Sequence, residues 1–344
     1  MKIPKKSIAK LQIVFYNYIV YTIHRDIHKM GVETTSKGNT GGIIMDTIRL
    51  KARAKINLGL DVVRRREDGY HEVRMVMQML KLYDQIDIEK TETPGIRLTC
   101  NLSFLPTDER NIAYKAAKVM MEQFDIKQGV CIRIEKHIPV AAGMAGGSTD
   151  CAAVLYGMNK LFDLQLSQKK LREIGVKLGA DVPYCLMRRT ALSEGIGEIL
   201  TPVAPLPDCP ILIAKPSISV SSRYVYEHLK LNEETLHPDV DGIVSALKAK
   251  DLYGVTDRLG NVLETVTIPE HPVIADIKQQ MMQSGAVNAL MSGSGPTVFG
   301  IFDDEDKAKK AFEDMKASGL ARQIYLTRPF NQKIKSTRKN QRKR

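Results

Sequence analysis

The feature that most constrains this chain is a run of small residues between a predicted strand and a predicted helix. Residues 138–153 read IPVAAGMAGGSTDCAA. The preceding residues, 130–138, alternate as a strand does, and residues 148–162 have the apolar spacing of a helix. Without bulky side chains, the backbone N–H groups of such a loop can turn inward and approach an anion. The sequence therefore predicts an anion-binding loop at a helix N-terminus, capped by Ser148 or Thr149.

The spacing of this loop excludes the most common phosphate-binding motifs. The Walker pattern GxxxxGK[ST] is absent, and the glycines are wrongly spaced for a dinucleotide-binding fingerprint. Neither HRD nor DFG, the signatures of a protein kinase, follows the loop. Taken alone, the segment is also compatible with a small-residue turn before a well-capped helix.

The segments around the loop predict two domains. The first is rich in predicted strands, and the stretch Pro202–Pro210 after it resembles a linker because it holds four prolines in nine residues. Beyond the linker, a predicted strand–strand–helix–strand series is typical of a split-βαβ sandwich. The expected domains are 45–203 and 204–328. The predicted strands are 48–63, 72–82, 85–90, 130–138, 211–214, 287–291, 297–302 and 322–327. The main predicted helices are 111–124, 148–162, 167–178, 221–230, 240–258, 271–284 and 304–318.

The net charge of +12 lies at the two ends of the chain. Residues 1–44 carry seven Lys or Arg and two acidic residues, and residues 329–344 carry seven Lys or Arg and no acidic residue. Residues 45–328 then hold 37 basic and 37 acidic residues. A neutral body with basic ends argues against specific nucleic-acid binding. We expect 1–44 to be an extension outside the fold and 329–344 to be a basic disordered tail.

The cysteines and the apolar runs indicate the environment of the protein. The five cysteines form no CxxC pair and no zinc spacing, which predicts free thiols in a reducing cytoplasm. The most apolar run, Leu11–Ile23, is shorter than the roughly 20 residues of a membrane span and is interrupted by Gln12 and Asn17. We therefore expect a cytoplasmic protein with no membrane segment.

Four further motifs accompany the loop in a fixed order. ARAKINLGL (52–60) places Arg53, Lys55 and Asn57 on one face of a strand. REDGYHEV (66–73) is a turn that carries Tyr70 and His71, and LGADVPYC (178–185) places Asp181 after a helix. MSGSGPTVF (291–299) is a second glycine-rich segment. Singly, each is compatible with an exposed strand, a hairpin turn or a helix end.

Together and in this order, the motifs resemble those of the 4-diphosphocytidyl-2-C-methyl-D-erythritol kinase family in the GHMP kinase superfamily. The resemblance covers about residues 48–327. It implies an α+β, two-domain GHMP-kinase fold, with a ribosomal S5 domain 2-like N-terminal domain and a ferredoxin-like α/β sandwich as the C-terminal domain. The sequence departs from the family at Arg188 and Arg189, where small glycines are usual, and at Ala141, Ala142 and Ala145. Alanine would be strained wherever φ is positive.

The resemblance also implies an activity. The family uses ATP and Mg²⁺ to phosphorylate the 2-hydroxyl of 4-diphosphocytidyl-2-C-methyl-D-erythritol, giving the 2-phosphate and ADP, in the non-mevalonate route to isoprenoid precursors. Asp181 is implied as the catalytic base with Lys55 beside it, and Ser148 as an oxygen donor to Mg²⁺. Asn57, Tyr70, His71 and Tyr226 are implied to bind the cytidine diphosphate substrate. The residues implied to hold ATP are Pro139, Val140, Ala141, Ala142, Gly143, Met144, Ala145, Gly146, Gly147, Ser148 and Thr149.

Two alternatives remain. One is another GHMP-type alcohol kinase, of the homoserine or mevalonate type, against which the DGYH turn argues because an aromatic–His pair suits a nucleobase. The other is an RNA-binding protein on an S5-like scaffold, suggested by the basic ends. For the oligomeric state, a monomer or a homodimer is expected.

Overall fold

The computed structural model describes residues 46–332, so the predictions for residues 1–44 and for residues 333–344 of the basic tail lie outside the described residues. The prediction of disorder from residue 329 onward was wrong for its first residues, because Pro329 bridges to Leu80 and the N–H of Phe330 donates to the carbonyl of Met79. A long antiparallel hairpin, β1 (Thr47–Arg65) and β2 (His71–Thr91), runs through the molecule. Within the described residues, seven strands form its sheet, in the order β3–β4–β2–β1–β8, with β5 joined to β2 and β6 to β5. The shorter strands are β3 (Ile96–Cys100), β4 (Gly129–Glu135), β5 (Ala191–Glu194), β6 (Ile199–Pro202) and β8 (Gly260–Asn261).

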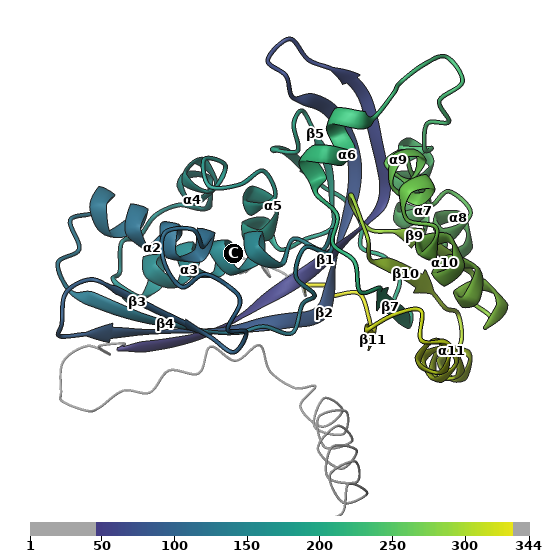
Figure 1. The fold of residues 1–344 in the computed structure, drawn as a ribbon. Coiled ribbons are helices and arrows are strands. Elements are labelled where there is room, and N and C mark those ends of the chain that lie inside the picture. Colours follow the sequence, from purple (N-terminus) through teal and green to yellow (C-terminus); the bar gives the residue numbers. More distant parts are fainter. Residues whose placement is uncertain (1–45, 333–344) are drawn as a thin grey trace, which may run out of the picture.

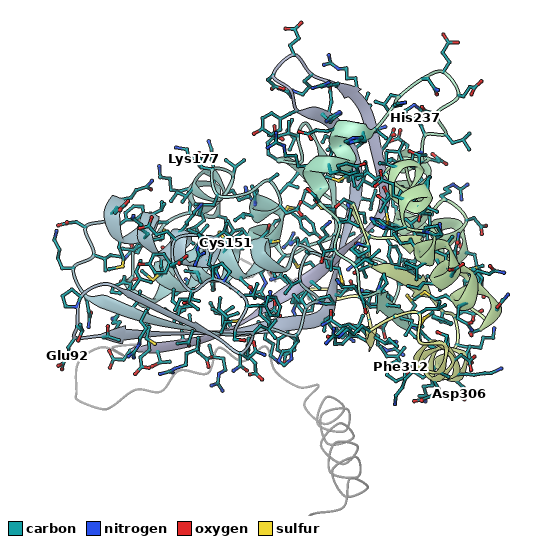
Figure 2. All side chains as sticks on the ribbon, viewed as in Figure 1. Glu92, Cys151, Lys177, His237, Asp306 and Phe312 are labelled. Carbon is teal, nitrogen blue, oxygen red and sulfur yellow. The ribbon has the colours of Figure 1, made fainter. Side chains whose placement is uncertain are left out.

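One face of this sheet is covered by helices, as Figure 1 shows above β3 and β4. The helices are α2 (Ile112–Gln123), α3 (Gly146–Leu161), α4 (Gln168–Gly175) and α5 (Val182–Met187). Helix α3 packs so closely on the sheet that a Cβ at Gly157 would meet Ile88 and Leu50. Cys151 of the same helix is fully buried, and Figure 2 shows it among these helices. The five cysteines are free, as predicted.

The second domain is built on a four-stranded antiparallel sheet in the order β11–β7–β10–β9. Counted along the chain, this is the strand order 4-1-3-2 of a ferredoxin-like sandwich, and it confirms the predicted fold. The strands are β7 (Ile211–Lys215), β9 (Asn288–Met291), β10 (Val298–Ile301) and β11 (Gln323–Thr327). The helices are α6 (Ser222–His228), α7 (Val240–Ala249), α8 (Leu252–Thr256), α9 (Glu264–Glu270), α10 (Val273–Gln283) and α11 (Glu305–Ser318).

Strand β1 belongs to two cores at once. Ile48 and Leu50 are buried under the helices of the first domain, whereas Ile56 and Leu58 are buried with the sheet of the second domain. The pairing with β2 shifts register between Arg53 and Lys55, where the buried residues of β1 pass from the first core to the second. Alternation predicted that Arg53 and Lys55 share a face, but only Lys55 lines the cleft described below. The Arg53 guanidinium lies 3.7 Å from the Phe330 ring, away from the residues that line the cleft described below.

Two element predictions were wrong. The predicted helix 240–258 is interrupted because Lys250 adopts a left-handed conformation with φ of 59° and Asp251 then caps α8. The strands predicted at 72–82 and 85–90 are one strand, β2. No helix within residues 46–332 has the length and apolar character that crossing a membrane requires.

Candidate active site

A cleft of about 920 Å³ lies where the two domains meet. Its lining includes most of the predicted anion-binding loop, residues 139–149, which we call the phosphate loop. The end of the β1–β2 hairpin, part of α6 and the segment 293–294 also line it. Lys55, Ser148 and Asp181 line this cleft, as do Tyr70, His71 and Tyr226. The fold therefore brings together six predicted site residues that lie up to about 170 positions apart in the sequence.

The phosphate loop differs from the predicted one where it joins its helix. Helix α3 begins at Gly146, and its N-cap is Ala145, which forms no side-chain capping bond. The prediction that Ser148 or Thr149 caps this helix was wrong, because the loop turns into the helix before either residue is reached. The first helical N–H groups have no intrahelical acceptor, and the glycines at 146 and 147 leave them uncovered beside the cleft. This is the geometry that a helix N-terminus offers to an anion.

Three loop residues adopt positive φ angles: Ala141 at 49°, Gly143 at 68° and Ala145 at 56°. The two alanines are strained by roughly 1–2 kcal/mol each relative to glycine, as the sequence predicted for any such position. At Gly143 a Cβ would overlap the carbonyl oxygen of Ser292, so only glycine fits. The hydroxyl of Ser292 donates to the carbonyl of Gly143 at 3.0 Å. The loop is thereby clamped between the two domains.

Lys55 and Asp181 face each other next to the loop. The Nζ of Lys55 lies 3.9 Å from Oδ2 of Asp181, and the lysine side chain is 6% exposed against 33% for the aspartate. The backbone N–H of Lys55 donates to the carbonyl of Met144 within the loop at 3.2 Å. Asp181 stands at the start of α5 and makes no capping bond, which leaves its carboxylate open to the cleft.

Asn57 supports Lys55 rather than the cleft. Its Oδ1 accepts a hydrogen bond from Lys55 Nζ at 2.7 Å, and its Nδ2 points at Met75 Sδ at 3.4 Å. The side chain is fully buried and is absent from the cleft lining. The structure therefore places this predicted substrate ligand behind the lysine, where it fixes the position of the ammonium group.

The far end of the cleft is aromatic. The His71 and Tyr226 rings lie 5.3 Å apart at an interplanar angle of 38°. Burial and the charge of Arg65 lower the pKa of His71, so that the imidazole is neutral at pH 7. Burial raises the pKa of the Tyr226 hydroxyl above its usual value. Tyr70 is 60% exposed at the mouth. A neutral imidazole beside the Tyr226 ring offers hydrogen bonding and stacking to a flat polar ring.

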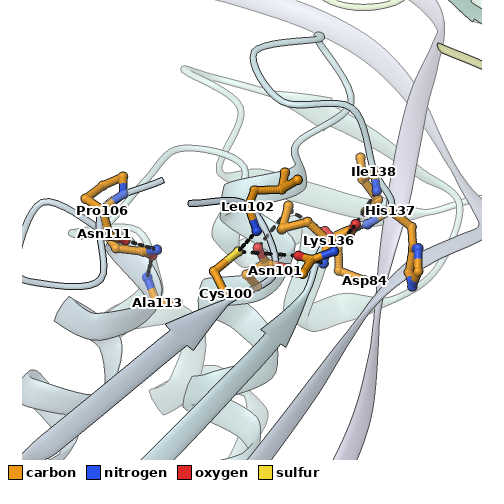
Figure 3. A network of polar contacts seen from close by, with 11 residues as sticks. Asp84, Cys100, Asn101, Leu102, Pro106, Asn111, Ala113, Lys136, His137 and Ile138 are labelled. Atoms are coloured by element: carbon orange, nitrogen blue, oxygen red, sulfur yellow. Dashed lines mark hydrogen bonds and ion pairs between the residues drawn. The ribbon is translucent and has the colours of Figure 1, made fainter. Parts of the chain in front are cut away.

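A buried charge cluster below the phosphate loop was not predicted. Lys136 Nζ bonds to a carboxylate oxygen of Asp84 and lies 2.8 Å from Asp150 Oδ2. The other oxygen of Asp84 accepts the backbone N–H groups of His137 and Ile138 at 2.6 and 2.8 Å (Figure 3). Burial, which outweighs the nearby lysine, raises the pKa of Asp150. The sequence contained one sign of this cluster. Lys136 alternates in phase with the apolar residues of the predicted strand 130–138, so a basic side chain points inward there.

The unusual arginines do not reach the cleft. Arg188 ends α5 in a left-handed conformation with φ of 57°, and neither Arg188 nor Arg189 lines the cleft. Burial lowers the pKa of Arg188. The end of the cleft at the phosphate loop is thus lined without them.

The comparisons with known proteins agree with this geometry. The models of the GHMP kinase N-terminal and C-terminal domains match residues 111–189 and 243–320. A 4-diphosphocytidyl-2-C-methyl-D-erythritol kinase of Lachnoclostridium phytofermentans is 55% identical over 84% of this chain and 99% of its own length. A crystal structure of a 4-(cytidine 5'-diphospho)-2C-methyl-D-erythritol kinase is 32% identical and covers 83% of this chain and 100% of that one, with a TM-score of 0.72.

A homoserine kinase structure from Cytophaga hutchinsonii shares the fold, with a TM-score of 0.68 over 86% of this chain and 98% of that one. Its sequence identity with this chain is only 20%. The likeness of sequence thus lies with the cytidyl kinases and not with the homoserine type. From the matched domains and the identity over nearly the whole length of its relatives, the chain belongs to the 4-diphosphocytidyl-2-C-methyl-D-erythritol kinase family of GHMP kinases.

Proposed function

We propose that this protein transfers the γ-phosphate of ATP to the 2-hydroxyl of 4-diphosphocytidyl-2-C-methyl-D-erythritol, giving the 2-phosphate and ADP. The observation that carries the proposal is one cleft that holds a phosphate loop at one end, an aromatic–His pocket at the other, and the Lys55–Asp181 pair between them. The product places the enzyme in the non-mevalonate route to isoprenoid precursors. The names of its relatives support this substrate.

Phosphoryl transfer depends on positioning and on charge stabilisation. The loop 139–149 and the first N–H groups of α3 bind the triphosphate. Asp181, whose carboxylate faces Lys55 in the cleft, accepts the proton of the attacking hydroxyl. The Lys55 ammonium, 3.9 Å from the Asp181 carboxylate, stabilises the negative charge that develops as the phosphoryl group moves. Asn57 holds the ammonium in place from behind.

The chemistry of the donors near the loop suits Mg²⁺ carried by the nucleotide. Mg²⁺ on a phosphate chain needs only one or two protein oxygens. Ser148 is half-buried in the cleft lining, next to Gly179 in the segment that leads to Asp181. Its hydroxyl would hold the ion, which neutralises charge on the phosphates when bound.

The aromatic end binds the cytosine. Tyr226 and Tyr70 stack on the base, and His71 forms hydrogen bonds with its edge. The five free thiols suit a reducing cytoplasm, where we place the protein as a monomer or homodimer without nucleic-acid or membrane partners.

The proposal is tested by ADP release from the full chain with Mg²⁺-ATP, with and without the cytidyl substrate. Asp181→Asn is compared with Asp306→Asn, which removes a carboxylate that is 92% exposed on α11. We expect turnover that depends on the substrate, falls about 10²- to 10⁴-fold in Asp181→Asn, and persists in Asp306→Asn. Turnover with mevalonate or homoserine but not with the cytidyl compound would refute the substrate. A folded protein inactive on all three would refute the kinase function.

A further inference from the structure

Five basic side chains line the cleft, and carboxylates hold four of them. The five are Lys55, Arg65, Arg110, Lys136 and Arg223. Lys55 and Lys136 have the partners already described. Arg110 lies 2.7 Å from Asp108, and Arg223 lies 2.7 Å from Glu227. Among the residues that the structure describes, Arg65 is the cleft-lining cation whose side chain forms no ion pair or hydrogen bond. The pKa of Glu227 is lowered mainly by its hydrogen bond with Arg223, and the charge of Arg65 makes a smaller contribution.

The two sequence neighbours of Arg65, unlike Arg65 itself, both form ion pairs. Arg64 pairs with Glu72 at 2.6 Å, and Arg66 pairs with Asp68 at 2.9 Å. Since side chains alternate along a strand, Arg65 points to the face opposite that of Arg64. In the hairpin its register partner is His71, and directly opposed residues share a face. Arg65 therefore lies beside the predicted base-binding imidazole, and its charge lowers the pKa of that ring.

The proposed reaction places two phosphate chains in one cleft. The ATP triphosphate occupies the loop and the N-terminus of α3. The substrate must reach from the aromatic pocket, where its base binds, to Asp181, where its hydroxyl reacts, so its diphosphate lies between these points. Lys55 and Lys136 already balance carboxylates there. A guanidinium without a carboxylate partner, next to His71, suits the paired oxygens of a diphosphate.

We propose that Arg65 binds the diphosphate of the substrate and so selects nucleoside diphosphate conjugates over nucleosides and monophosphates. The inference rests on the proposed function, because it takes the base-binding end to be at His71 and Tyr226. Arg65 is a binding residue in this proposal and takes no part in proton or phosphoryl transfer.

The experiment measures the affinity of cytidine, CMP and CDP by calorimetry. The full chain is saturated with a non-hydrolysable ATP analogue, so that the phosphate loop is filled. Arg65→Gln is compared with Arg64→Gln, a neighbour whose charge faces Glu72 outside the cleft lining. At a pH well above the usual histidine value of about 6.5, where His71 is neutral in both proteins, we expect the ratio of CDP to cytidine affinity to fall about tenfold or more in Arg65→Gln, with cytidine affinity unchanged. Arg64→Gln should keep the wild-type ratio.

Several results would overturn the inference. An unchanged CDP-to-cytidine ratio in Arg65→Gln would show that the guanidinium does not contact the diphosphate. An equal loss for cytidine and CDP would show that Arg65 only supports the hairpin and His71. Failure of the proposed function gives another pattern, in which the wild type binds none of the three ligands and does not turn over the cytidyl substrate. If the wild type turns over substrate while the ratio is insensitive to Arg65, the function stands and only the inference falls.

Discussion

Under the proposed function, the two ends of the cleft recognise their ligands by different means. At the phosphate loop the binding groups are backbone N–H groups, set by the positive φ angles of Ala141, Gly143 and Ala145. Buried charges lie below the loop, and Ser292 clamps it from the second domain. At the proposed base-binding end, the binding groups are the side chains of His71, near the end of an exposed hairpin, and of Tyr226, on the short α6.

The backbone groups at the loop end are fixed by the fold, whereas the side chains at the base end can be substituted singly. The loop end has few side chains to exchange, and a change there disturbs packing across two domains. The base end can change one side chain without disturbing the backbone. We therefore expect substitutions at the loop end to lower stability and ATP binding together, and substitutions at the base end to alter only the affinity for the cytidyl ligand.

The largest effect is expected from Lys136→Met. It removes the only cation described between Asp84 and Asp150 and leaves two buried carboxylates without a counter-charge. Breaking such a buried cluster should lower the free energy of unfolding by about 3–5 kcal/mol, which urea unfolding measures. Lys118→Met, at an exposed ion pair with Glu109, is the control and should change little. Equal stability of the two variants would contradict the role given to the cluster.

Next in size is a matched pair of glycine substitutions. Gly143 and Gly69 both have positive φ, but a Cβ at Gly143 would overlap Ser292, whereas a Cβ at Gly69 meets nothing within 4 Å. Gly143→Ala should lower the free energy of unfolding by about 2–4 kcal/mol through overpacking and strain and raise the KM for ATP. Gly69→Ala should show only the strain, roughly 1–2 kcal/mol. The clamp would be refuted if both variants lost the same stability and ATP affinity.

Tyr226→Ala isolates the base end. Loss of the ring should weaken cytidine binding by about 1–3 kcal/mol, the usual range for base–aromatic stacking, while the KM for ATP stays unchanged. Tyr226→Phe keeps the ring and should keep most of the affinity. Calorimetry with cytidine gives the first value and steady-state kinetics the second. A parallel rise of the KM for ATP would mean that the two ends are not independent.

The smallest effect is a pH dependence. Since burial and Arg65 lower the pKa of His71, the imidazole stays neutral through pH 7 and gains its proton only below the usual value of about 6.5. A protonated ring can no longer accept a hydrogen bond from the base, so cytidine affinity should fall as the pH drops below that value. Arg65→Gln removes one cause of the low pKa and should move the fall to higher pH. His71→Gln should give a flat profile, and a flat wild-type profile would contradict the assignment.

The sequence predicted the parts of the fold that local patterns control. Alternation located β1, and helical spacing located α2 and α3 to within two residues. It missed α9, which holds Pro269 inside its length, because proline normally argues against a helix. It also missed the break at Lys250, since a left-handed lysine leaves no local signal.

The site divides in the same way. The small-residue loop was visible because its geometry depends on neighbours in sequence. The roles of Asp84, Asn57 and Arg65 were not visible, because each depends on a partner that only the fold supplies. Asn57 alternates in phase with Lys55, but alternation cannot tell a residue that lines a cleft from one buried behind it.

The contacts between residues 329–330 and strand β2 limit how the domains of this enzyme could be exchanged with those of a relative. Pro329 bridges to Leu80, the N–H of Phe330 donates to Met79, and the amide of Gln78 reaches the carbonyl of Phe330. Residues near the end of the second domain thus complete the middle of the first hairpin. If one domain alone were exchanged with that of a relative, the contacts between β2 and residues 329–331 would join segments from two different proteins. A functional chimera therefore has to transfer β1, β2 and residues 329–331 together.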